Sequence, residues 1–151
     1  MRRRSKRPTD PLEAAALAEV RSIYADLAAR PVTRACTLRT ECCHFKLTGR
    51  TPLLTTGEAR LAAKALRATG RRALPDRTDG ACPLLDEKTA RCLIYDGRPF
   101  GCRTHYCAAA GGPTARRDVL DLIRRLEAVD ESLGGDGPHP IGSAVTRALE
   151  R

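Results

Sequence analysis

Seven cysteines occupy the middle of this chain of 151 residues and are absent from both ends. They form two blocks, the first holding Cys36, Cys42 and Cys43 and the second holding Cys82, Cys92, Cys102 and Cys107. Thiolates bind zinc in tetrahedral sets and hold iron–sulfur clusters in sets of four. An odd number of cysteines leaves one thiol unpaired in any full disulfide scheme. The clustering therefore favours a metal centre over disulfides.

The spacing of the cysteines excludes the familiar thiol motifs. Five residues separate Cys36 from Cys42, and nine separate Cys82 from Cys92 and Cys92 from Cys102. Because the chain has no C-x-x-C, zinc-finger, zinc-ribbon and thioredoxin sites all fail. Seven thiols exceed one four-coordinate site, so either one centre has three spare cysteines or two centres exist. In an extended chain, the adjacent cysteines of the first block would face opposite sides.

Other side chains near the cysteines could complete or support such a centre. His44 and His105 could join a second ligand set. Bound thiolates carry excess negative charge, and Arg98 and Arg103 flank Cys102, where they could donate charge-assisted hydrogen bonds to sulfur. We therefore predict that these two arginines stabilise the bound group.

Composition and charge limit the cellular compartment and the kinds of binding partner that we expect. Residues 1–9 carry a run of arginines and lysines and are expected to form a disordered basic arm. The segment that follows contains Glu13, Glu19 and Arg21, and no long apolar run exists, so we expect a cytoplasmic protein without a membrane partner. Disulfides are disfavoured in that compartment. The net charge of +9 permits a nucleic-acid or acidic protein partner, although three Tyr, two Phe and no Trp leave few rings for base stacking.

Helices must position the cysteine blocks. Asp10 and Pro11 predict a helix start, an apolar stripe continues to Leu27, and Pro31 ends the helix near Arg30. A capping box from Thr55 to Glu58 opens a second helix that ends at Gly70. A third helix is predicted at about 114–133. A short last helix carries apolar residues at positions 141, 145 and 149.

The second cysteine block is predicted to form a small β-hairpin over residues 82–107. Leu84 and Leu85 lead into a polar turn, and residues 91–95 return as a strand with β-branched and aromatic side chains. Asp96 and Gly97 then turn the chain, which Pro99 keeps extended.

The residues of this block resemble those of a known family. Cys82-Pro, Cys92-Leu-Ile-Tyr, Arg98-Pro and Cys102-Arg are similar to the pattern of the YkgJ-type cysteine-cluster family, a zinc- or iron-chelating domain with a CxxCxxCC signature. Cys36, Cys42 and Cys43 match its first, third and fourth cysteines.

One signature position departs from this family, because Arg39 stands where its second cysteine would be. Residues 54–58 also resemble the start of the helix that follows the signature, so the resemblance covers about residues 36–107. Relatives within this family include flagellin lysine methylases, which are similar to this chain in the cluster region alone.

These observations predict a mostly α-helical protein with a short β-hairpin, in which residues 10–151 form one small domain around a cysteine-ligated metal centre. The first hypothesis is a metal-binding protein, with zinc or a [4Fe–4S] cluster, in a structural, electron-transfer or partner-binding role. An alternative is an iron–sulfur enzyme with a methyltransferase-like activity, although the chain has no nucleotide-binding glycine loop and no paired catalytic carboxylates. A second alternative is a nucleic-acid-binding protein with a structural metal.

Overall fold

The computed structural model describes residues 10–31, 41–105 and 110–151, and its elements are mostly helices, as the sequence predicts. Helix α1 (Pro11–Ala29) begins as expected, because the side chain of Asp10 accepts a hydrogen bond from Leu12 N at 3.0 Å. It ends at Arg30, one residue before Pro31. Residues 1–9, the predicted basic arm, lie outside the described residues.

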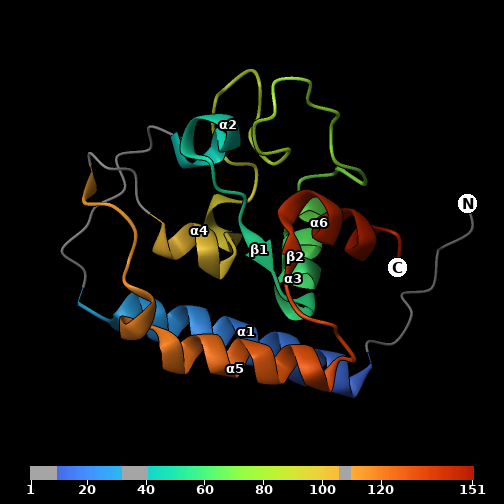
Figure 1. Ribbon diagram of the computed structural model, residues 1–151. Helices are drawn as coiled ribbons and strands as arrows, with labels where there is room; N and C mark the ends of the chain where they lie inside the picture. The colour runs from blue at the N-terminus through green and yellow to red at the C-terminus, as the bar shows by residue number, and fades with distance from the viewer. Residues whose placement is uncertain (1–9, 32–40, 106–109) are drawn as a thin grey trace, which may run out of the picture.

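Helix α5 (Leu120–Ser132) lies beside α1, and the two form one layer of the molecule (Figure 1). The sequence predicts a helix from about residue 114, but the regular helix starts later, after a short 3-10 helix at Arg116–Asp118. The buried faces of α1 and α5 meet through aliphatic side chains, including Val20, Ile23, Leu122 and Leu126. These form one of two cores.

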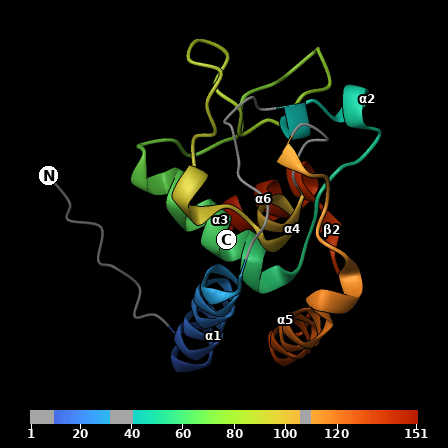
Figure 2. The same cartoon turned by 90° about the vertical axis from the view of Figure 1, so that its left-hand side faces the viewer.

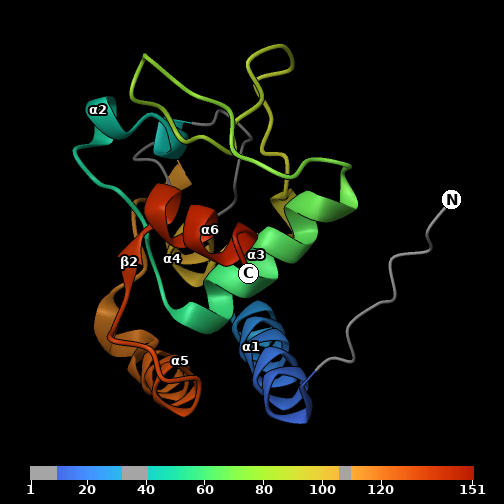
Figure 3. The same cartoon turned by 90° about the vertical axis from the view of Figure 1, so that its right-hand side faces the viewer.

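Helix α3 (Thr56–Ala68) begins at the predicted capping box, in which Thr55 and Glu58 bond each other's backbone. It packs against α6 (Ile141–Leu149), the predicted last helix, and Figure 3 shows the two side by side. Two short strands, β1 (Leu53–Leu54) and β2 (His139–Pro140), pair antiparallel and tie the start of α3 to the start of α6. Strands of two residues are too short for a periodic pattern, so sequence reasoning missed them.

The predicted hairpin is present only as a tight reversal. A single antiparallel bridge joins Leu85 to Cys92, with Leu93 N donating to Leu84 O at 2.8 Å. The predicted strand over residues 91–95 is wrong, because a 3-10 helix forms at Tyr95–Gly97 and the short helix α4 (Phe100–Thr104) follows. Pro99 keeps extended backbone angles, as the sequence predicts, and it caps α4, which begins at the next residue.

The second core lies between the α3–α6 pair and the loops that precede α4. It includes Leu54, Leu66, Leu84, Ile94 and Val145. Above it, the chain from residue 69 to residue 99 runs mostly without regular structure, together with the short helix α2 (Phe45–Thr48) (Figures 1 and 2). Several cysteines of the described chain border this core, and Cys82 is part of it.

None of the helices in the described part of the chain is both long enough and apolar enough to cross a membrane.

Candidate metal centre

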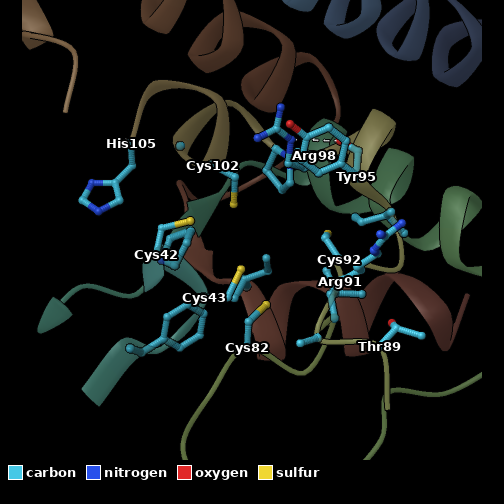
Figure 4. Close-up of a pocket in the computed structure, with 18 residues that line it drawn as sticks. Cys42, Cys43, Cys82, Thr89, Arg91, Cys92, Tyr95, Arg98, Cys102 and His105 are labelled. Carbon is cyan, nitrogen blue, oxygen red and sulfur yellow. Dashed lines mark hydrogen bonds between the residues drawn. The ribbon is translucent and has the colours of Figure 1, made fainter. Parts of the chain in front are cut away.

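Five cysteines from four separate stretches of chain line one cavity of about 520 Å³. They are Cys42, Cys43, Cys82, Cys92 and Cys102, and Figure 4 shows their side chains directed toward a common central space. All five are free thiols. Cys36 and Cys107, the other two predicted ligands, lie outside the described residues. The tertiary structure therefore brings both cysteine blocks to the same place.

The adjacent pair Cys42 and Cys43 both face this cavity, which corrects the expectation that they point to opposite sides. The expectation assumed an extended chain, whereas Glu41–Cys43 form a 3-10 helix. Successive side chains of a 3-10 helix are a third of a turn apart, so two neighbours can line the same space. Cys82 N donates to Cys43 O at 2.7 Å, which joins the first cysteine block to the second.

The remaining two thiols are positioned by the reversal and by helix α4. Cys92 is held by the bridge to Leu85. Cys102 lies on α4, whose first backbone N–H, that of Phe100, donates to the buried carboxylate of Glu58 at 2.7 Å. The position of Cys102 therefore depends on a side chain from α3.

Glu58 is the residue whose role sequence reasoning understated. The capping box identifies it, but its carboxylate also accepts from the Tyr24 hydroxyl at 3.1 Å and from Phe100 N. One buried side chain thus connects α1, α3 and α4. No sequence signal marks the contact with Phe100, because the two residues are far apart along the chain.

The thiols influence one another's protonation. The hydrogen bond with Cys43 lowers the pKa of Cys42 to about 6 and raises the pKa of Cys43. Burial raises the pKa of Cys82 to about 11 and also raises the pKa of Cys102, and neighbouring sulfurs increase both shifts. Thiolates collected here repel one another, so a cation among them would favour their ionised form.

The two predicted arginines occupy different positions. Arg98 lines the cavity, and its guanidinium stacks over the Tyr95 ring at 3.9 Å. Burial raises the pKa values of Cys92 and Cys102, and the charge of Arg98 opposes both shifts.

Arg103 is not among the residues that line the cavity. It donates to the carbonyl oxygens of Arg98 and Asp96 at 2.6 and 2.7 Å, and its guanidinium lies 4.4 Å from the Tyr24 ring centroid. Arg103 therefore holds the loop that carries Arg98.

The histidines lie apart from the thiols. His44 is exposed and precedes α2. His105 lines the edge of the cavity, 3.4 Å from an Arg50 nitrogen, and points away from the sulfurs in Figure 4. His139, which lies on β2, pairs with Asp136.

The donor set fits a thiolate-binding metal in type and in number. Soft thiolate ligands favour zinc, Cu(I) and iron–sulfur clusters, and at least four thiols face one space. Within the described ranges, however, no group of three or more His, Cys, Asp or Glu side chains could hold a metal ion in this arrangement. The sulfurs surround a cavity and do not converge on one point.

A family model described as "CxxCxxCC: Putative zinc- or iron-chelating domain" matches residues 34–122. The match begins just before the first cysteine block and ends within α5. No curated protein and no solved structure matches the chain.

Proposed function

Because the chain belongs to the CxxCxxCC family of zinc- or iron-chelating domains, we propose that it is a metal-binding protein whose thiol cavity holds an iron–sulfur cluster. Cys82, Cys92 and Cys102 would supply three ligands, and the Cys42–Cys43 pair would supply the fourth. The observation that carries the proposal is that five thiols from four segments face one cavity. When bound, a cluster supplies one-electron redox chemistry.

The volume of the cavity that the five thiols line, about 520 Å³, supports a cluster over a single zinc ion. Zinc binds each thiolate at about 2.3 Å, so a tetrahedral site places its sulfurs about 3.8 Å apart. In a [4Fe–4S] cluster each cysteine binds a different iron, so the ligand sulfurs remain further apart.

The bound group would also stabilise the loop layer. The chain between α3 and α4 has one β-bridge and one 3-10 helix as its regular structure, and it carries Cys82 and Cys92. A centre bound to these two cysteines and to Cys102 would connect the loops to α4. We therefore propose a structural role, in which the metal-free chain keeps the α1–α5 layer and loses order between residues 71 and 99.

Metal and sulfide analysis after anaerobic purification tests the identity of the group. The expected result is a brown protein with visible absorption and equal amounts of iron and acid-labile sulfide. A colourless protein with one equivalent of zinc would refute the cluster but keep the thiol site. A protein that binds neither metal after reconstitution would refute the whole proposal.

Single substitutions test the ligand assignment. Cys82→Ser, Cys92→Ser and Cys102→Ser should each lose most of the bound metal. Thr89→Ser is the matched control, because it lines the same cavity and keeps a hydroxyl that can bond Asp86. Full metal content in all three cysteine variants would show that the ligands lie elsewhere.

Hydrogen exchange followed by mass spectrometry tests the structural role. Removing the metal should abolish protection over residues 71–99 while the amides of α1 and α5 exchange as before. Equal protection of residues 71–99 in both forms would mean that the loops hold their structure without the metal.

A further inference from the structure

A second cavity, of about 210 Å³, lies between the start of α3 and the end of α6 and shares no lining residue with the thiol cavity. Its charged lining consists of Arg60 on α3, Arg147 on α6 and Arg151 just beyond α6. His139 from β2 is a further lining residue. Small side chains such as Ala148 form part of the wall.

Arg60 is the buried member of this group, since its side chain is only 9% exposed. One terminal nitrogen lies 3.5 Å from a Glu13 carboxylate oxygen. The Nε atom is fully buried and has no hydrogen-bond partner among the described residues. A buried donor without an acceptor costs free energy, so this side chain has unused capacity to bind an anion.

The two other arginines lie at the exposed rim. Arg147 lies on α6 and Arg151 lies two residues beyond its end, and both line the cavity. In the ranges that the structure describes, neither forms an ion pair with an acidic side chain. Burial lowers the pKa of Arg60, and the charge of Arg151 lowers it further. Like charges therefore converge without a complete set of counter-ions.

The acidic groups nearby offset only part of this charge. Glu13 pairs with one edge of Arg60, and the charge of Asp10 acts on the same guanidinium. Asp136 pairs with His139, which lowers the pKa of its carboxyl, and the charge of Arg147 lowers that pKa further. The first backbone N–H groups of α3 are already bonded to Glu58 and to Asp130, so they add no free donors. Three arginines thus face one cavity with one carboxylate in direct contact.

From this arrangement we propose that the cavity is an oxyanion site for inorganic phosphate or for the phosphate group of a small metabolite. Guanidinium groups bind phosphate oxygens through paired, charge-assisted hydrogen bonds. The volume of about 210 Å³ is below the roughly 300–1,000 Å³ of pockets that enclose drug-sized ligands. The cavity therefore matches a phosphate group and is too small to enclose a whole nucleotide. This site is independent of the metal centre.

Calorimetric titration of the full chain with sodium phosphate, at constant ionic strength, tests this proposal. Arg147→Gln and Arg60→Gln should each weaken phosphate binding about tenfold or more, as expected for the loss of charge-assisted hydrogen bonds. Arg124→Gln is the control, because it removes the same charge from an exposed position on α5 that does not line the cavity. It should bind phosphate as the unmodified chain does.

Two arms complete the experiment. Glycerol phosphate that binds tighter than inorganic phosphate would identify an organic phosphate as the ligand, and the reverse order would identify the free anion. Should Arg60→Gln fail to fold, the exposed Arg147→Gln variant still decides the question. The proposal is wrong if phosphate does not bind, or if Arg124→Gln weakens binding as much as Arg147→Gln does.

Discussion

Replacing Glu58 with leucine should destabilise the protein by about 3–5 kcal/mol, because this carboxylate satisfies several buried donors at once. It is 2% exposed. It accepts hydrogen bonds from Thr55 N and Thr55 Oγ1 at 3.0 Å, from Phe100 N at 2.7 Å and from the Tyr24 hydroxyl at 3.1 Å. Leucine matches its size but accepts none of these.

The magnitude follows from the donors that leucine would leave unpaired. Each buried donor without an acceptor costs roughly 1–3 kcal/mol. The Thr55 hydroxyl can rotate, which leaves two backbone N–H groups and the Tyr24 hydroxyl as the main losses. Such costs are not additive, and burial of the leucine side chain recovers some hydrophobic free energy. The expected loss of stability therefore lies near the lower end of the range obtained by adding the three costs. Tyr24→Phe removes one donor and should cost only about 1 kcal/mol.

Chemical denaturation with urea, followed by far-ultraviolet circular dichroism, measures these values. Glu127→Leu is the matched control, since it makes the same change at an exposed position on α5 and should alter stability by less than about 0.5 kcal/mol. The metal content of a folded Glu58→Gln variant should also fall, because Phe100 N begins the helix that carries Cys102. A Glu58→Leu protein as stable as the control would refute the reasoning.

The same carboxyl gives a pH dependence with a definite sign. Burial raises the pKa of Glu58 above its usual value, and the hydrogen bonds from Thr55, Phe100 and Tyr24 only partly oppose the shift. The folded state therefore holds this proton to a higher pH than the unfolded chain does. The resulting stabilisation is full below the unfolded pKa, about 4.3, and is lost as the pH rises through the folded pKa. The stability of the unmodified protein relative to Glu58→Gln should decline over this window, and a rising difference would contradict the assignment.

Four further substitutions test the fold. Ala90 has a φ of 54°, so Ala90→Gly should stabilise the protein by about 0.5–1 kcal/mol in urea denaturation, and a loss would argue against this turn. Gly57→Ala would place a Cβ 2.9 Å from Val20 and should cost about 1–3 kcal/mol. Gly142→Ala, whose Cβ would meet nothing within 3.8 Å, should be neutral or stabilising, and equal effects at both glycines would refute the packing described. Arg125 pairs with two α1 carboxylates, so Arg125→Gln should lower the urea midpoint slightly; a loss undiminished by 1 M salt would be inconsistent with surface ion pairs.

The helices were predictable because their signals are local. Asp10, Pro11 and the Thr55–Glu58 capping box act within one turn of the chain, and the apolar stripes repeat at helical spacing. The β1–β2 pair and the short helix α4 were not predictable. Their few residues are ordered by partners distant in sequence, such as the pairing of Leu54 with His139.

The family was also readable from the sequence, since the number and clustering of the cysteines and the residues around the second block point to the one that the comparison shows. The orientation of the cysteines was not. Whether Cys42 and Cys43 face one space or two depends on a 3-10 helix, which no sequence periodicity marks over three residues.

The sequence by itself determined the chemistry: soft thiol donors, too many and too closely grouped for chance, between helices with strong local signals. The tertiary structure alone decided which donors meet, because packing of the loops onto α3 and α6 brings the cysteine blocks together across long stretches of chain. It also decided that Arg98 faces the thiols while Arg103 braces its loop, and that three arginines share a second cavity. The sequence sets the type of each residue. The distance between residues that are remote in the sequence is set by the packing of apolar side chains into the buried cores.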